Sequence, residues 1–259
     1  LSHQIATGLR HFHNRADATL VPTADLQAEL IKAGFTQVHV FGQGVDVDLF
    51  APTRRDERLR AAWGCGAGDL AVLYVGRMTV EMDLDLACEA FAAIAARDPG
   101  ARFVLVGDGP ELTGLARDHP GFICIGAKVN EELATHYASG DLLLCPSLAE
   151  TFSNQIPEAM ACALPVIAFD QAAAHAYIQS RVNGVTVQLG DHAGFIAAAL
   201  DAAADFGHLR AMGEEARRTA LDLSWERILN EVESLLWAVI RQRRAGKNPP
   251  TRAPTESSD

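Results

Sequence analysis

LLLCPSLAETFSNQIPEAMACALPVIAFD, residues 142–170, reads as a strand, a loop, a helix and a second strand. The runs at 142–147 and 165–170 are apolar without alternation, which is typical of strands buried on both faces of a parallel sheet. Ser153 or Asn154 is a suitable N-cap for the helix between them. The stretch therefore predicts one βαβ unit of an α/β fold.

The same alternation continues along most of the chain. Further apolar runs predict strands at 18–23, 37–42, 71–76, 102–107, 122–126 and 184–188. Apolar residues at helical spacing predict helices at 84–98, 131–139, 192–206 and 224–243. Strands that alternate with helices imply a doubly wound, parallel, Rossmann-like sheet. No apolar run approaches about 18 residues, so we expect no membrane-spanning helix.

The chain divides into five predicted segments. Residues 1–40 hold one strand and one helix, which is the end of a domain and not a complete one. Residues 41–70 read as a linker and a helix, and residues 71–223 as the sheet domain. Residues 224–243 form a C-terminal helix. Residues 244–259 are rich in proline, serine and charge, and we expect them to be disordered. The chain starts with Leu rather than Met, which leaves open that it is a fragment.

Charge and cysteine content exclude some function classes. The net charge of -11 disfavours nucleic acid as a partner, because phosphate neutralisation dominates that affinity. The five cysteines match no metal-binding spacing, and the nine histidines form no metal motif, so we expect no metal. Cys124 and Cys145 lie in apolar runs and are expected to be buried free thiols, which points to the cytoplasm. The first residues lack a signal peptide pattern.

The candidate chemistry lies where the predicted strands end. In open α/β sheets, ligands bind beyond the carboxyl ends of the strands. The opening stretch places Glu150 and Glu158 there, with seven residues between them. Carboxylates suit vicinal diols, and the start of a helix suits phosphate. The alternative is that Glu158 complements the helix dipole and that Glu150 lies in solvent.

These residues resemble the E-x7-E signature of retaining glycosyltransferases with the GT-B fold, family 4 or group 1. The resemblance extends from Thr19 to Ile240. It includes "GQGVDVDLF", "LYVGRMTVEMDLDL", "VLVGDGPE", "ICIGAKVNEELATHYASGDLLLCPS" and "ETFSNQIPEAMACALPVIAFDQAAAHAYI". The chain is thereby identified as the donor-binding C-terminal half of such an enzyme, preceded by the last βα unit of the N-terminal acceptor domain.

The resemblance implies roles for particular residues. Glu158 would bind the ribose of a nucleotide-diphosphate sugar, Glu150 would face the donor sugar, and Arg77 would clamp the diphosphate. Glu150 and Arg77 would be the catalytic pair, with no metal and no other cofactor. The residues expected to line the sugar, diphosphate and base are Thr151, Phe152, Ser153, Asn154, Gly126, Ala127 and Lys128. Gly44 and its neighbours would form the hinge between domains.

The implied activity is transfer of a mannose- or glucose-type hexosyl group to a lipid or glycan acceptor, with GDP-mannose or a UDP-hexose as donor. The missing N-terminal half would bind the acceptor and could bring the enzyme to the inner face of the membrane. One alternative is a non-catalytic nucleotide-sugar-binding or regulatory module. Another is a dehydrogenase, which lacks support because no complete G-x-G-x-x-G follows the first strand of the sheet.

The sequence departs from the family pattern at three positions. Met82 stands where the family has a lysine, which removes a cation from beside the diphosphate. Ser153 replaces a glycine in the loop, where its Cβ would crowd the donor. Ala163 replaces another glycine, a change that we interpret as a matter of packing. We expect this chain to bind the donor nucleotide and to transfer little or no sugar alone.

Overall fold

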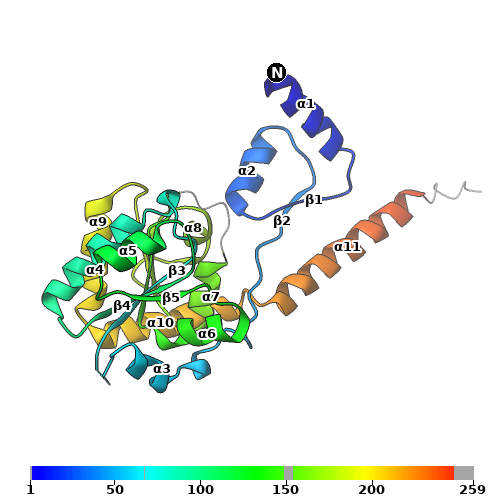
Figure 1. The fold of residues 1–259 in the computed structure, drawn as a ribbon. Helices are drawn as coiled ribbons and strands as arrows, with labels where there is room; N and C mark the ends of the chain where they lie inside the picture. The colour runs from blue at the N-terminus through cyan, green and yellow to red at the C-terminus, as the bar shows by residue number, and fades with distance from the viewer. Residues whose placement is uncertain (1, 67, 149–153, 248–259) are drawn as a thin grey trace, which may run out of the picture. The chain divides into compact units, whose positions relative to one another are not determined.

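The computed structural model describes residues 2–66, 68–148 and 154–247. The chain separates into two compact units, one of residues 1–42 with 226–259 and one of residues 43–225. Figure 1 labels the elements.

The first unit contains one small parallel sheet. Its elements are α1 (Ser2–His13), β1 (Thr19–Val21), α2 (Ala24–Lys32), β2 (Val38–Val40) and most of α11 (Trp225–Lys247). β1 pairs with β2 in parallel, and the hydroxyl of Thr23 caps α2 by accepting from the amide of Leu26 at 3.1 Å. Arg243 in α11 pairs with Asp17 at 2.6 Å. The predicted strand, cap and helix at the start of the chain are confirmed.

The second unit is built around a six-stranded parallel sheet. Its strands are β3 (Ala71–Val75), β4 (Arg102–Val106), β5 (Ile123–Gly126), β6 (Leu142–Cys145), β7 (Val166–Phe169) and β8 (Val185–Val187). Their order is β5-β4-β3-β6-β7-β8, and every neighbouring pair is parallel. This is the doubly wound Rossmann order. The predicted α/β fold is confirmed, and all eight predicted strands are present.

Helices surround this sheet. They are η1 (Pro52–Arg54), α3 (Glu57–Ala62), η2 (Val80–Met82), α4 (Leu84–Arg97), α5 (Leu112–Asp118), α6 (Asn130–Ser139), α7 (Gln155–Ala161), α8 (Ala172–Tyr177), α9 (His192–Ala203) and α10 (Phe206–Leu221). The sequence did not predict α10, whose two glycines and many charges weaken the helical pattern. The predicted helix at 192–206 ends at Ala203, because Asp205 caps α10 through the amide of His208.

Successive strand residues face opposite sides of the sheet, and each side has its own apolar core. In β3, Leu73 packs with α6 and α7, whereas Val72 packs with α4 and α9. Both side chains have an exposure of 0%. Since both faces are covered, the strands need no polar residues, which explains the continuous apolar runs.

Four details differ from the sequence-based expectations. Asn154 occupies the N-cap position of α7, but its side chain makes no capping hydrogen bond. Ala163 has a φ of +57°, a left-handed conformation that disfavours side chains with a Cβ, so the missing glycine is a matter of backbone strain and not of packing. Cys124 is only partly buried, although Cys145 is buried as expected, and neither of them forms a disulfide within the described residues. The helix α11 continues to Lys247, and residues 248–259 lie outside the described residues.

The linker before the sheet is held to the second unit. Arg217 in α10 donates to the carbonyls of Val47 and Phe50 at 3.0 and 2.8 Å. The same guanidinium donates to the carbonyl of Ala161 in α7 at 2.6 Å. A Cβ at Gly44 would lie 2.3 Å from the ring of Trp225, so this position requires glycine. The hinge role of Gly44 stays a prediction.

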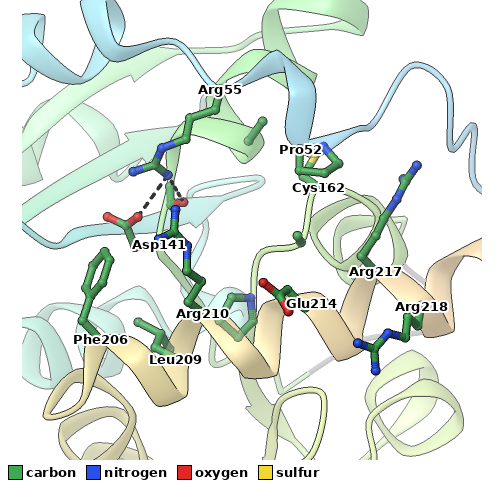
Figure 2. A pocket seen from close by; sticks show the side chains of 14 residues that line it. Pro52, Arg55, Asp141, Cys162, Phe206, Leu209, Arg210, Glu214, Arg217 and Arg218 are labelled. Atoms are coloured by element: carbon green, nitrogen blue, oxygen red, sulfur yellow. Dashed lines mark hydrogen bonds and ion pairs between the residues drawn. The ribbon is translucent and has the colours of Figure 1, made fainter. Parts of the chain in front are cut away.

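A pocket of about 540 Å³ lies at the amino edge of the sheet, where β6 and β7 begin. Figure 2 shows Arg55 turned toward Asp141 across this pocket. Most of its arginines are already engaged: Arg55 bonds Asp141 at 3.1 Å, Arg217 bonds three carbonyls, and Arg218 pairs with Glu215. We therefore interpret this pocket as a structural feature and not as a binding site. The candidate site lies at the opposite, carboxyl edge of the sheet.

None of the described helices is long and apolar enough to cross a membrane.

Candidate functional site

The carboxyl edge of the sheet has a switch point between β3 and β6. From β3 the chain winds outward through β4 and β5, and from β6 it winds the other way through β7 and β8. The loops after β3 and β6 therefore separate above the sheet and leave a crevice, the usual place for a ligand in this architecture. The loop after β3 carries Arg77, and the loop after β6 leads to α7 and Glu158. The fold thus brings these two predicted residues to one edge.

The loop after β3 is tightly packed against its neighbours. A Cβ at Gly76 would lie 2.2 Å from the side-chain nitrogen of Gln155, the first residue of α7. A Cβ at Gly107, after β4, would lie 1.8 Å from the carbonyl oxygen of Gly76. The hydroxyl of Tyr74 donates to the carbonyl of Arg77 at 2.7 Å. The backbone at Arg77 is therefore fixed, while its side chain is exposed at this edge of the sheet.

Glu158 lies in the first turn of α7 and is partly buried. Its amide donates to the carbonyl of Asn154 at 2.9 Å. Burial raises the pKa of the Glu158 carboxyl to about 7, although the nearby hydroxyl of Tyr137 acts in the opposite direction. A carboxyl group in this state changes its charge near neutral pH, a property common at functional sites.

The loop after β5 holds the residues predicted beside the base. Gly126 has a φ of +79°, and its carbonyl accepts from the amide of Gly107 at 3.0 Å. Ala127 follows it and is exposed. The side chain of Lys128 is 28% exposed and pairs with Glu132 of α6 at 3.4 Å. These residues lie at the carboxyl edge, two strands away from β3.

Four predicted site residues lie outside the described residues. They are Glu150, Thr151, Phe152 and Ser153. Asn154, which follows them directly, is exposed. The roles assigned to this loop stay predictions.

Met82 is buried, with an exposure of 8%. Its sulfur accepts a hydrogen bond from the hydroxyl of Ser147 at 3.4 Å, and the amide of Leu148 bonds the carbonyl of Glu81 at 3.4 Å. The turn η2 is therefore joined to the exit of β6. A long side chain at position 82 would start at this junction, beside the switch point.

Two residues of the site were not found from the sequence. The side chain of Gln155 packs against Gly76, and the hydroxyl of Tyr137 in α6 lies close enough to Glu158 to lower the pKa of its carboxyl. Polar or aromatic side chains at such positions have no signature of their own. Only the packing of α6 and α7 against the sheet brings them to the site.

The chain matches the family model described as "Glycosyl transferases group 1" over residues 69–205, which is more than half of its length. The chain belongs to this family. The likeness predicted from the sequence motifs is thereby confirmed.

Two curated relatives are mycobacterial. The chain is 35% identical over 224 residues to a "GDP-mannose-dependent alpha-mannosyltransferase" of Mycobacterium tuberculosis, covering 86% of this chain and 57% of the relative. It is 35% identical over 236 residues to the protein of that name from Mycolicibacterium smegmatis, covering 90% of this chain and 60% of the relative. The chain thus spans less than two thirds of these relatives.

Solved structures share the fold. Sucrose-phosphate synthase from Thermosynechococcus elongatus superposes with a TM-score of 0.77 at 24% identity, over 95% of this chain and 63% of that chain. Anabaena HepE, solved in complex with UDP, superposes with a TM-score of 0.78 at 21% identity, over 92% of this chain and 68% of that chain. At these identities the likeness shows the fold alone.

Proposed function

We propose that this chain is the donor-binding part of a retaining hexosyltransferase that uses a nucleotide-diphosphate sugar. The observation that carries the proposal is that Arg77 and the partly buried Glu158 follow the two strands of the switch point and lie at the same carboxyl edge of the sheet. Family membership supports it. The names of the two mycobacterial relatives favour GDP-mannose as donor and mannose as the transferred sugar.

The proposed chemistry follows from the charges at this edge. The Arg77 guanidinium clamps the diphosphate and stabilises the negative charge that develops on it as the glycosidic bond breaks. The Glu158 carboxylate accepts hydrogen bonds from the two ribose hydroxyls. Glu150 faces the sugar, and no metal takes part. Acceptor binding, to a lipid or a glycan, belongs to the part of the relatives that this chain does not span.

Nucleotide binding tests the proposal directly. Titration with GDP, UDP and ADP should raise the melting temperature with one nucleotide only, which identifies the base. A ligand at 100 times its dissociation constant stabilises a protein by about 2.7 kcal/mol. For a domain of this size we expect a rise of roughly 5–10 °C. If none of the three nucleotides changes the melting temperature, the donor-binding function is wrong for this chain.

The non-catalytic alternative rests on Met82, and Met82→Lys tests whether position 82 faces the diphosphate. A lysine has an apolar stem that can pass Ser147 and an ammonium group that can reach the carboxyl edge. A new charged hydrogen bond to the diphosphate is worth about 1.5–3 kcal/mol, so GDP affinity should rise on the order of tenfold or more. Isothermal titration calorimetry measures this.

Met82→Leu is the matched control, because it keeps an apolar side chain of similar volume. Its GDP affinity should equal that of the unmodified chain. If Met82→Lys binds GDP no better than Met82→Leu, position 82 does not face the diphosphate and the family lysine has no role here.

A further inference from the structure

Tyr137 is a fully buried tyrosine whose hydroxyl has no hydrogen-bond partner among the residues that the structure describes. Its side chain is 0% exposed, and the ring of Phe50 packs on it edge to face with centroids 6.0 Å apart. Within the described part of the chain, the hydroxyl makes no hydrogen bond. An unpaired buried hydroxyl destabilises a protein, so phenylalanine would serve packing better at this position. We therefore expect the hydroxyl to gain a hydrogen-bond partner in another state of the protein.

The carboxyl group of Glu158 lies next to this hydroxyl. The two groups affect each other's titration: Glu158 raises the pKa of Tyr137, and Tyr137 lowers that of Glu158. The two groups are thus close enough for a hydrogen-bonding influence on each other's pKa, but within the described residues the Tyr137 hydroxyl makes no hydrogen bond of standard length and angle. Closing this contact requires the Glu158 side chain and the hydroxyl to approach each other.

Other titratable groups surround the pair. The thiols of Cys145 in β6 and Cys162 after α7 also face Tyr137, and burial raises the pKa of Cys162. Arg217 and Arg54 act on Cys162 in the opposite direction. Glu158 is the one carboxylate of the described residues that acts on the Tyr137 hydroxyl.

We propose that Tyr137 is a positioning residue for Glu158: its hydroxyl donates a hydrogen bond to the carboxylate when a nucleoside diphosphate binds. The inference rests on the proposed function, since it assigns the other side of that carboxylate to the ribose hydroxyls. The loop Gly126–Lys128 leads into α6, which carries Tyr137, and α7 carries Glu158. The bond would therefore join the helix behind the base loop to the group that holds the ribose.

Tyr137→Phe and Glu158→Gln, singly and together, test the inference. Calorimetry with GDP at pH 8 and pH 6 should show binding on the order of tenfold weaker in Tyr137→Phe at pH 8. The difference should be smaller at pH 6, where the carboxyl is largely protonated. In the Glu158→Gln background, Tyr137→Phe should change the affinity little, because the two residues act through one bond. Thermal unfolding of each variant confirms that it is folded.

A ligand-free measurement keeps this inference separate from the proposed function. The titration midpoint of the Glu158 carboxyl, followed by carbon NMR, should rise in Tyr137→Phe because the nearby hydroxyl is gone. If no nucleotide binds but the midpoint rises, the proposed function is wrong and the contact between the two residues stands. An unchanged midpoint overturns the inference. So does a loss of affinity that is equally large with Glu158→Gln already present, since Tyr137 would then act only through packing.

Discussion

Asp141→Asn is expected to lower the free energy of unfolding by about 3–5 kcal/mol, because it leaves a buried arginine without its counter-ion. Asp141 lies just before β6 with a side chain that is 7% exposed. It pairs with Arg60 at 2.8 Å and with Arg55 at 3.1 Å, and it accepts from the amide of Ala71 at 2.8 Å. The side chain of Arg60 is only 1% exposed.

The remaining partners of Arg60 cannot replace this charge. Its guanidinium also donates to the carbonyls of Ser139 at 2.8 Å and Asp69 at 2.7 Å, which are neutral. Glu57 approaches at 3.5 Å, but its side chain is 67% exposed, so solvent weakens that pair. An asparagine would moreover turn an amide donor toward a guanidinium. Urea unfolding monitored by circular dichroism measures the decrease in the free energy of unfolding.

Asp118→Asn is the control for this prediction. Asp118 also pairs with an arginine, Arg117, but both side chains are largely exposed, at 56% and 77%. Exposed pairs contribute little to stability, so this variant should unfold almost as the unmodified chain does. A loss below about 1 kcal/mol in Asp141→Asn would contradict the assignment of Asp141 as the counter-ion that the second unit requires.

Glu158→Gln should make the protein more stable at pH 8 and a weaker binder of GDP. Burial raises the pKa of Glu158 from an ordinary 4.5 to about 7, so the folded chain keeps a proton that the unfolded chain releases between these values. The stability that this proton contributes is fully present below about pH 4.5 and is lost as the pH rises through 7. Glutamine is neutral at every pH, so the variant should gain up to about 3 kcal/mol at pH 8 and nothing at pH 4.

The effect on binding has the opposite sign. Two ribose hydroxyls that donate to a carboxylate lose charged hydrogen bonds when the acceptor becomes an amide. A loss of about 1.5–3 kcal/mol corresponds to a GDP affinity on the order of tenfold to a hundredfold lower at pH 8. Since the variant is more stable, unfolding cannot account for weaker binding. Calorimetry and thermal melts on the same samples give both quantities.

Glu89→Gln is the control, because Glu89 lies exposed on α4 and away from the candidate site. It should change neither the stability at pH 8 nor the GDP affinity. If Glu158→Gln binds GDP as tightly as Glu89→Gln does, Glu158 does not hold the ribose. If Glu158→Gln is no more stable than the unmodified chain at pH 8, ionisation of the Glu158 carboxyl does not destabilise the folded protein.

The sequence was sufficient for the architecture because burial leaves a direct pattern. Strands covered on both faces must be apolar at every position, so the run at 71–76 could be recognised without any tertiary information. The alternation with helices then implied a parallel sheet, and the position of Arg77 and Glu158 after two strands implied one shared edge. Membership of the family followed from motifs in the right order.

Other features follow from contacts between segments far apart in the chain, which leave no local pattern. Tyr137 reaches Glu158 only because α6 and α7 pack on the same face of the sheet. The left-handed backbone at Ala163 is set by the turn between α7 and β7, where a Cβ at Gly213 would lie 2.2 Å from the Ala163 carbonyl oxygen. The helix α10 is stabilised by its buried face more than by its residues' intrinsic propensity.

Thus the residues by themselves determined the fold class, the family and the edge of the sheet that carries the chemistry. The tertiary structure decided which polar groups are buried together: Asp141 with Arg60, and Tyr137 beside Glu158. The physical reason is that burying a helix or a strand requires a regular pattern of apolar residues, and this pattern is visible in the sequence. The charge state of a carboxyl depends instead on how much water its neighbours exclude, and those neighbours come together only in the folded protein.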